Sequence, residues 1–224
     1  MSHKVIAIDG PAGSGKSTTA RIVAARLGFV YLDTGAMYRS ITYLALRQRI
    51  ALSDEESLAE LAKCTVIRFS IRDGIQLTLA NGEDITVEIR SAEVTASVSE
   101  VSAHPAVRRI LVQQQQQYGA SADLVVEGRD TTSVVFPHAF LKIYLAADVE
   151  ERAKRRVKDF EKLGKGTALE EQIEDIKRRD KYDSSRSASP LTCTPDSVIV
   201  DTTDLTIEQQ SERIIELYRE RASR

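Results

Sequence analysis

Residues 10 to 17 read Gly10-Pro11-Ala12-Gly13-Ser14-Gly15-Lys16-Ser17. This glycine-rich segment follows the apolar run Val5 to Ile8 and precedes a helical pattern, which is the context that a phosphate-binding loop requires. Glycines let backbone N–H groups approach phosphate oxygens, Lys16 supplies a mobile cation, and the Ser17 hydroxyl can bind Mg²⁺ at the positive end of the helix. Thr18 adds a second hydroxyl to this rim. The segment therefore predicts a nucleotide-binding protein.

Apolar runs alternate with stretches of helical periodicity along the rest of the chain. These runs are Val5 to Ile8, Val30 to Leu32, Leu124 to Val126, Leu141 to Ala146 and Val198 to Val200. Because nearly continuous apolar strands separated by helices are typical of parallel sheets covered on both faces, we predict a doubly wound α/β fold around a five-stranded parallel sheet.

Residues that begin or end helices support this fold. The expected signals are Gly28 and Gly119 at helix ends, Pro105 in a first turn, and the capping boxes Ser53 with Glu56 and Thr206 with Gln209.

Two segments depart from the α/β pattern. Between Thr65 and Val87 the apolar period changes to two, and Asp73-Gly74 and Asn81-Gly82 are turn signals, so we predict a small antiparallel insert. Lys162 to Thr167 holds two glycines between charged helices and indicates either a mobile lid or a simple helix connection. We expect a single domain, with a core of about 1–62, 91–150 and 168–224, an insert at about 63–90 and a lid at about 151–167.

The composition limits the possible partners and location. Thirty-one basic and 33 acidic side chains give a net charge of -2, so we expect no general attraction to nucleic acid or to anionic membranes. Cys64 and Cys193 form no CxxC pair and no metal-ligand spacing, and we interpret both as packing residues in a reducing compartment. Without a signal peptide or an apolar run of membrane-spanning length, we expect a cytoplasmic protein, and we expect it to be a monomer.

Several arginines accompany the predicted phosphate loop. Arg39 and Arg129 follow apolar strands, at the edge where α/β proteins bind ligands. On a predicted helix from about Glu170 to Arg186, three residues share one face, namely Arg179, Asp183 and Arg186. A further group lies on the predicted helix that leads into Lys162 to Thr167, namely Arg152, Arg155 and Arg156. Each group alone could be a solvated surface, but beside Lys16 they favour a protein that binds two phosphate-bearing ligands.

Phosphoryl transfer between two phosphates fits this inventory of side chains. Such transfer needs placement and charge neutralisation more than a general base, because the acceptor oxygen is already anionic. His3, His104 and His138 lie in unrelated contexts, and we interpret them as structural or surface residues. Glu127 could orient Mg²⁺-bound water, or it could be a simple acidic residue at a strand end.

Several segments, in this order, are similar to those of the bacterial cytidylate kinase family. They are residues 10–17, Leu32 to Arg39, Gly128 to Asp130 with Val134 to Pro137, and Arg179-Asp180-x-x-Asp183-x-x-Arg186. The region Gly82 to Ile85 with Glu88 to Arg90 also resembles the extra strand region of that family. The resemblance extends nearly from end to end.

The resemblance implies transfer of the γ-phosphoryl group of ATP to CMP or dCMP in the presence of Mg²⁺. It implies that Ser99, Arg108 and Asp130 read cytosine, and a carboxylate that accepts from the exocyclic amine is chemically sensible. Thr34, Arg39, Arg129 and Arg186 would surround the acceptor phosphate, and Arg179 and Asp183 would lie near the sugar and the transferring phosphate. Gly10 to Thr18 would bind ATP, with Arg152, Arg155 and Arg156 as lid arginines. The catalytic set would be Lys16, Arg129, Arg179 and Arg186.

One position departs from the family pattern, which commonly has a glycine two residues after the Arg-Asp pair. This chain reads Asp130-Thr131-Thr132-Ser133 there, so Thr132 would be strained if the position required a positive φ. Otherwise we expect the loop to differ in shape or to carry extra hydroxyl contacts.

The same residues allow some other classes of nucleotide-binding protein and exclude one. A kinase for another nucleoside monophosphate is an alternative, and one for a metabolite alcohol would want a carboxylate base. A non-catalytic nucleotide-binding module is an allowed use of the same loop. A regulatory GTPase is excluded, because the only asparagine, Asn81, precedes Gly82 and cannot form the guanine-reading Asn-Lys-x-Asp signature.

Overall fold

The computed structural model describes residues 3–72, 75–162, 164 and 166–223. The chain packs as two units, which are described separately here. Unit 1 contains Met1–Tyr31 and Tyr118–Arg224, and unit 2 contains Leu32–Gln117. The predicted division of a single domain into a core, an insert and a lid stays a prediction.

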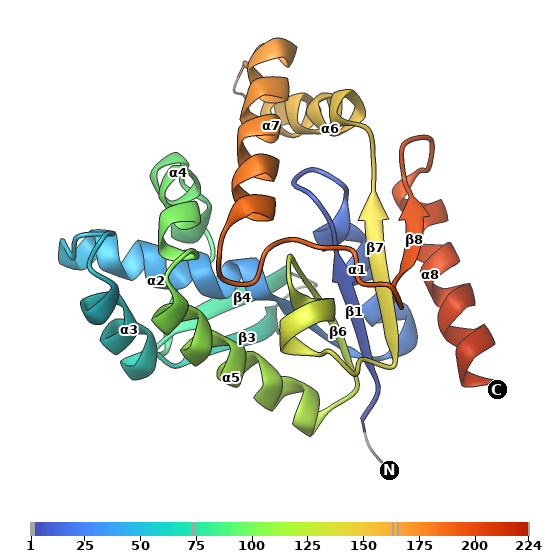
Figure 1. Ribbon diagram of the computed structural model, residues 1–224, viewed down its shortest axis with the longest axis horizontal. Helices are drawn as coiled ribbons and strands as arrows, with labels where there is room; N and C mark the ends of the chain where they lie inside the picture. The colour runs from blue at the N-terminus through green and yellow to red at the C-terminus, as the bar shows by residue number, and fades with distance from the viewer. Residues whose placement is uncertain (1–2, 73–74, 163, 165, 224) are drawn as a thin grey trace. The chain divides into compact units, whose positions relative to one another are not determined.

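A five-stranded sheet forms the centre of the α/β fold, in the order β2-β6-β1-β7-β8 (Figure 1). Its strands are β1 (Val5–Asp9), β2 (Val30–Asp33), β6 (Leu124–Gly128), β7 (Leu141–Ala146) and β8 (Val198–Asp201). The pairings of β1 with β6, β1 with β7 and β7 with β8 are all parallel. The doubly wound sheet predicted from the five apolar runs is therefore confirmed.

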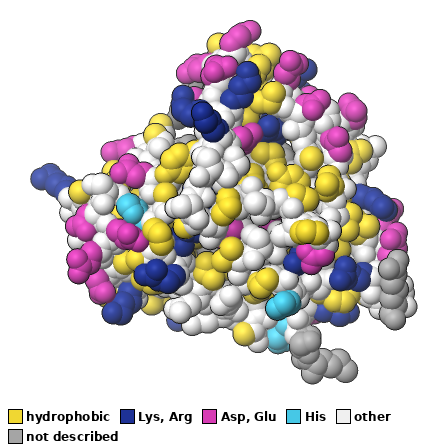
Figure 2. All heavy atoms as spheres, viewed as in Figure 1, with side chains coloured by type: hydrophobic (Ala, Val, Ile, Leu, Met, Phe, Trp, Pro, Cys, Tyr) yellow, Lys and Arg dark blue, Asp and Glu magenta, His cyan; other side chains and the backbone are white. Residues whose placement is uncertain are grey.

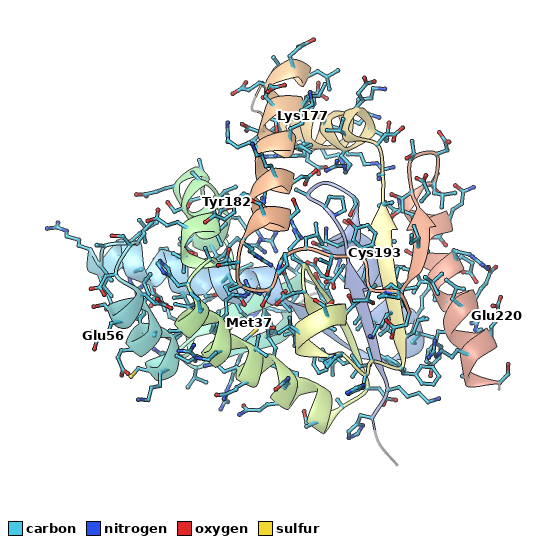
Figure 3. The ribbon with its side chains drawn as sticks, in the orientation of Figure 1. Met37, Glu56, Lys177, Tyr182, Cys193 and Glu220 are labelled. Carbon is cyan, nitrogen blue, oxygen red and sulfur yellow. The ribbon has the colours of Figure 1, made fainter. Side chains whose placement is uncertain are left out.

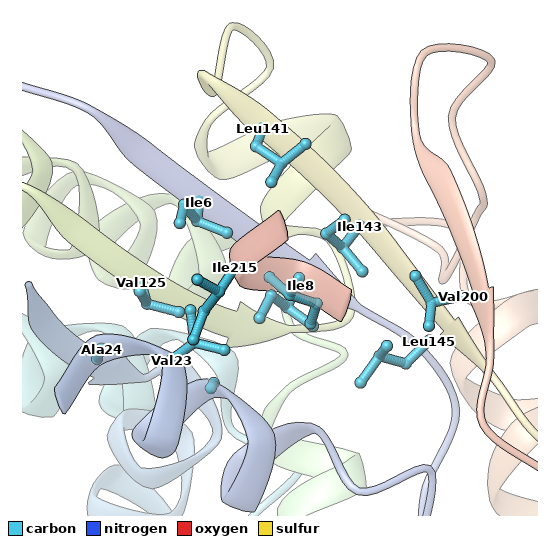
Figure 4. Close-up of a cluster of buried hydrophobic side chains, with 12 residues drawn as sticks. Ile6, Ile8, Val23, Ala24, Val125, Leu141, Ile143, Leu145, Val200 and Ile215 are labelled. Atoms are coloured by element: carbon cyan, nitrogen blue, oxygen red, sulfur yellow. The ribbon is translucent and has the colours of Figure 1, made fainter. Parts of the chain in front are cut away.

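The main core of unit 1 fixes the central strand. Ile6 and Ile8 of β1 pack with Ile143 and Leu145 of β7, and Ile215 packs on the same cluster (Figure 4). The helices of unit 1 are α1 (Lys16–Leu27), α6 (Val149–Lys162), α7 (Leu169–Ser185) and α8 (Ile207–Ala222), with a short π-helix, η2 (Thr131–Val135). Because every residue of β1 is buried, the chain leaves the carboxyl end of this strand at a well-defined position.

Unit 2 carries the small antiparallel sheet, in the order β3-β4-β5. Its elements are α2 (Thr34–Gln48), α3 (Glu55–Cys64), β3 (Ile67–Arg72), β4 (Ile75–Ala80), β5 (Glu83–Asp84), the 3₁₀ turn η1 (Glu88–Arg90) and α4 (Ala92–Val101). Asn81 and Gly82 have φ values of 51° and 87°, as the predicted tight turn requires. The other predicted turn, Asp73-Gly74, lies outside the described residues. Helix α5 (Pro105–Ser121) has residues in both units.

Three predicted helix signals are confirmed. Gly28 ends α1 with φ 70°, Pro105 is the first residue of α5, and Thr206 with Gln209 forms a capping box at α8.

Two predicted helix signals are wrong. Asp54, not Ser53, caps α3, because its carboxylate accepts the Ser57 N–H at 3.1 Å. Gly119 does not end α5, which continues to Ser121; a Cβ there would lie 2.5 Å from Phe136 Cε1, so this glycine allows close packing instead.

The interpretation of the cysteines as packing residues is also wrong. Cys64 and Cys193 are both exposed, and Cys193 lies in the segment between α7 and β8 (Figure 3). Within the described part of the chain, the helices are too short or too polar for any of them to span a lipid bilayer. Of the predicted lid, residues 151–162 belong to α6, whereas residues 163 and 165 lie outside the described residues.

Candidate functional site

The loop between β1 and α1 has the backbone of a phosphate cradle. Gly10, Gly13 and Gly15 have φ values of 152°, 79° and 90°, which residues other than glycine rarely adopt. A Cβ on Gly10 would also collide with the backbone carbonyl oxygen of Leu145. The glycines therefore permit both the conformation of the loop and its close approach to β7, and the predicted strand–loop–helix context is confirmed.

Lys16 is the buried cation of this loop, with only 5% of its surface exposed. Its Nζ donates to the carbonyl oxygen of Pro11 at 2.6 Å and to Ser14 Oγ at 3.3 Å. Burial lowers the pKa of Lys16 to about 7, helped by the positive charges of Arg129 and Arg179, while Glu127 and Asp9 act in the opposite direction. A cation held in this way would gain strongly from an anionic ligand.

The depressed pKa of Lys16 predicts a pH dependence of stability. Between pH 7 and 10.5 the unfolded chain binds the proton that the folded protein has lost, so stability rises with pH in this window. We expect the free energy of unfolding of the parent, relative to a Lys16→Met variant, to rise from pH 7 to 9 by up to about 1.4 kcal/mol per pH unit. Urea unfolding of both proteins measures this difference, and a flat difference would contradict the depressed pKa.

Ser17 and Glu127 bring two oxygen groups together beside Lys16. The Ser17 hydroxyl donates to Glu127 Oε1 at 2.7 Å, and Glu127 is buried near the end of β6. Ser17 itself is exposed at the first turn of α1. Hydroxyl and carboxylate oxygens are ligands that Mg²⁺ prefers, so this pair fits such an ion in chemical character.

Arg129 and Asp183 form a buried ion pair next to this loop. Arg129 Nε donates to Asp183 Oδ2 at 2.8 Å, and only 18% and 6% of the two side chains are exposed. Burial would lower the pKa of Arg129, but Asp183, Glu127 and Asp9 raise it overall. Burial would likewise raise the pKa of Asp183, but its arginine neighbours, chiefly Arg129 and Arg179, lower it overall. Both groups therefore remain charged at neutral pH.

The arginines predicted to share a face of α7 do converge near Asp183, but not all from the helix. The helix ends at Ser185, and Arg186 has an extended backbone, so its placement within the helix was wrong. Arg186 Nε donates to the carbonyl oxygen of Ser189 at 2.7 Å. Arg179 and Arg186 both lie close enough to depress the pKa of Asp183. Unit 1 therefore gathers four cations, namely Lys16, Arg129, Arg179 and Arg186.

Asp130 lies between Arg129 and the π-helix η2, and it is buried. Its carbonyl oxygen accepts the N–H groups of Val134 and Val135 at 2.9 and 3.1 Å. Among the described non-glycine residues, positive φ is confined to Arg49, Asn81 and Ser189. Thr132 is therefore unstrained, and the departure from the family pattern takes the form of extra hydroxyl contacts, which reach Asp9.

The three arginines of α6 have different surroundings. Arg152 is buried, and its Nη1 donates to Asp180 Oδ2 at 2.6 Å and to the carbonyl oxygen of Ala12 at 3.0 Å. Arg155 donates to the carbonyl oxygen of Thr202, and Arg156 lies over the Phe160 ring at 5.9 Å. Elsewhere on α6 and α7, acidic and basic side chains intermingle at the surface (Figure 2). Arg152 is thus attached to the phosphate loop itself.

Unit 2 holds the other predicted ligand residues. Asp33 caps α2 by accepting the Ala36 N–H at 2.8 Å, and it also accepts from Arg39 Nη2 at 3.0 Å. Thr34 is the buried first residue of the same helix. One carboxylate therefore caps the helix and orients the arginine.

Arg108 occupies a buried position on α5. Its Nη1 donates to the carbonyl oxygen of Ser102 at 2.8 Å, and its guanidinium lies 5.1 Å from the centre of the Tyr38 ring. Ser99 is half-buried on α4, where its carbonyl oxygen accepts from the Ser102 hydroxyl at 3.0 Å. The structure thus links Arg108 to Ser99 through Ser102.

The sequence reasoning missed the carboxylates that position these cations. Asp9, Asp33 and Asp180 each orient a loop or an arginine, yet none was assigned a role of its own. Asp9 and Asp33 are the last residues of apolar strands, and this position was the signal that could have identified them.

Comparisons with known proteins concern the whole sequence. A family model described as "Cytidylate kinase" matches residues 6–220. The chain is 48% identical over 216 residues to "Cytidylate kinase" of Lysinibacillus sphaericus (strain C3-41), covering 96% of both proteins. It is 47% identical over 218 residues to "Cytidylate kinase" of Bacillus subtilis (strain 168), covering 97% of both.

A solved structure shares the fold at low sequence identity. An uncharacterized protein from Eubacterium ventriosum ATCC 27560 has a TM-score of 0.56 and 11% identity, over 97% of this chain and 99% of that one. This likeness concerns the fold alone. With the family model covering most of the sequence and relatives close to half identical over nearly its full length, the chain belongs to the cytidylate kinase family.

Proposed function

We propose that the protein is an ATP-dependent kinase that transfers the γ-phosphoryl group of ATP to CMP or dCMP, giving ADP and CDP or dCDP. The observation that carries this proposal is the cluster in which the buried Lys16 and the partly buried Arg129 lie beside a phosphate loop. Buried cations are costly unless an anion accompanies them, and family membership identifies which anions these are. Products of this kind belong to pyrimidine nucleotide metabolism. A cytoplasmic monomer stays a prediction from the sequence.

The donor side is assigned to residues 10–18. The N–H groups of the loop and the start of α1 bind the ATP phosphates, and Lys16 turns from Pro11 to them. Ser17 and Glu127 would hold Mg²⁺, directly or through water, and this ion would neutralise phosphate charge. The lid arginines of α6 are assigned to the ATP phosphates as well.

The acceptor side is assigned to the residues that the family resemblance indicates. Arg129 and Arg186 are assigned to the acceptor phosphate, and Arg179 and Asp183 to the sugar and the transferring phosphate. Asp183 also orients Arg129 by accepting from its Nε. The resemblance also assigns Thr34 and Arg39 to the acceptor phosphate. The base is read by Ser99, Arg108 and Asp130, whose donors and carboxylate match the acceptors and the exocyclic amine of cytosine.

The reaction then needs no proton transfer from the protein. An oxygen of the acceptor phosphate attacks the γ-phosphorus, the bond to the β-phosphate oxygen breaks, and ADP leaves. Lys16 and the arginines neutralise the charge on the transferring group, and their burial strengthens this effect.

A ranking of acceptors tests the proposal. Coupled ADP release with CMP, dCMP, UMP, AMP, GMP and dTMP should show CMP and dCMP as preferred by kcat/KM. Preference for another monophosphate would transfer the assignment to a different kinase, and the absence of turnover with every acceptor would leave a non-catalytic binding module.

Asp130→Ala should lower the preference for CMP over UMP. The variant loses the acceptor for the cytosine amine, whereas uracil presents an oxygen there, so we expect the ratio of kcat/KM values to fall by about 10-fold or more. The KM for ATP should change little. Asp130→Asn is the matched control, because its amide can donate to the uracil oxygen and should favour UMP. Unchanged discrimination in both variants would defeat the assignment.

A further inference from the structure

Asp9 accepts four hydrogen bonds from two consecutive threonines. Its Oδ1 accepts from the N–H and the hydroxyl of Thr131, at 3.0 and 2.7 Å. Its Oδ2 accepts from the N–H and the hydroxyl of Thr132, at 2.8 and 2.7 Å. Each carboxylate oxygen thus receives one backbone and one side-chain donor, and the side chain of Asp9 is fully buried.

The sheet does not require this carboxylate. Asp9 is the last residue of β1, and the parallel pairing already sets it against Gly128 at the end of β6. Burial raises the pKa of Asp9, while the N–H and O–H donors of Thr131 and Thr132 act in the opposite direction. A buried carboxylate is a poor source of stability compared with an apolar side chain of similar volume, which favours a specific positioning role.

The segments that Asp9 connects are those assigned to the two substrates. Asp9 is bonded through the chain to Gly10, the first residue of the phosphate loop. Thr131 and Thr132 directly follow Arg129 and Asp130, and they begin the π-helix η2. Asp9 is thus adjacent to the first residue of the phosphate loop, and Thr131 is adjacent to Asp130. The hydrogen bonds of Asp9 therefore join a segment assigned to ATP directly to a segment assigned to the acceptor.

We propose that Asp9 is a positioning residue that holds Arg129 and Asp130 in register with the phosphate loop, so that acceptor and donor are aligned for transfer. The inference rests on the function proposed above. Bidentate anchoring of two successive N–H groups fixes both the translation and the rotation of the backbone that precedes them. Catalysis is sensitive to such placement, because displacement by about 1 Å can cost about 100-fold in rate.

Asp9 could instead act only as a negative charge near Lys16, whose pKa it raises. The two threonines separate these roles. Thr132→Val removes a donor to Asp9 and leaves the charge of Asp9 in place, whereas Asp9→Asn removes the charge and turns one accepting oxygen into an amide that faces N–H donors.

The test compares kinetics in Thr132→Val, Thr132→Ser and Asp9→Asn. If Asp9 positions the acceptor site, Thr132→Val should lower kcat/KM for CMP by about 10-fold and reduce the CMP to UMP ratio, while the KM for ATP stays within about 2-fold. Thr132→Ser keeps the hydroxyl and should restore both values. Asp9→Asn should have the larger loss; if it does not fold, the threonine variants still decide.

Thr65→Val is the matched control. Thr65 is buried in unit 2, and its hydroxyl donates to the carbonyl oxygen of Leu61 at 2.6 Å, so this variant loses a comparable bond. Urea unfolding should show similar destabilisation in Thr65→Val and Thr132→Val, with altered selectivity only in the latter.

Three outcomes would overturn the inference. The anchoring has no positioning role if Thr132→Val keeps the parental ratio of kcat/KM for CMP to that for UMP. The same conclusion follows if kcat/KM falls equally for CMP and UMP and the KM for ATP rises by the same factor. A strong effect of Asp9→Asn together with parental kinetics in Thr132→Val would identify Asp9 as a counter-charge only. A parent protein that fails to phosphorylate CMP refutes the proposed function, and the inference with it, and is recognised before any variant is made.

Discussion

Lys16→Met should turn over at least about 100-fold more slowly than the parent at saturating ATP and CMP, because it loses the lysine that we assign to the transferring phosphate. Lys16 is the first residue of α1, and its ammonium donates to the carbonyl oxygen of Pro11 within the loop. It is buried, and burial strengthens its interaction with charge that develops on a phosphate. Methionine has a similar length, and it removes the charge together with the donors to Pro11 and Ser14.

The free energy of unfolding separates this effect from damage to the fold. Because the pKa of Lys16 is depressed to about 7, the parent bears an electrostatic cost at this site, and Lys16→Met should be at least as stable at neutral pH. Loss of turnover in a protein of undiminished stability would therefore report on catalysis alone.

Lys142→Met is the matched control for Lys16→Met. Lys142 is also a buried lysine of unit 1, and its Nζ pairs with Asp196 Oδ2 at 2.7 Å. It has no assigned role in phosphate binding, so its variant should lose stability but keep a kcat near that of the parent. A kcat for Lys16→Met within about 10-fold of the parent would contradict the role of this cation.

The sheet and the phosphate loop could be predicted because local signals specify them. Apolar runs of strand length predict strands, and the glycines around Lys16 predict a phosphate loop, from local sequence alone. The role of Gly119 was misread for the converse reason. Gly119 has no side chain because Phe136 packs closely against it. Phe136 lies in a later segment of the chain, so no local pattern around Gly119 predicts this contact.

The candidate site divides in the same way. Spacing along a predicted helix could place Arg179 and Asp183 on one face, but the helix end before Arg186 depends on contacts of the following loop, such as the bond from Arg186 to Ser189. The four bonds at Asp9 depend on the packing of β1 beside β6, so its partners 122 and 123 residues away could not be read from spacing.

Arg129→Met should reduce kcat/KM for CMP by about 1000-fold, the other large effect that we expect, because this arginine is largely shielded from water and assigned to the acceptor phosphate. Its removal also leaves the Asp183 carboxylate buried without the nearest of its cations, so stability should fall by about 1 to 3 kcal/mol. Steady-state kinetics and urea unfolding of the same preparation measure the two quantities.

A second substitution separates these two consequences. Arg129→Met combined with Asp183→Leu removes both charges, so the stranded carboxylate is gone and much of the lost stability should return, as replacement of buried ion pairs by apolar side chains often permits. Activity should not return, because the acceptor phosphate still lacks its guanidinium. Arg129→Lys keeps a charge without the planar donors, so its kcat/KM for CMP should lie between the values for the parent and for Arg129→Met. If the double variant recovered activity along with stability, Arg129 would serve the fold through Asp183 rather than the acceptor, and the proposed cluster of cations would lose its central member.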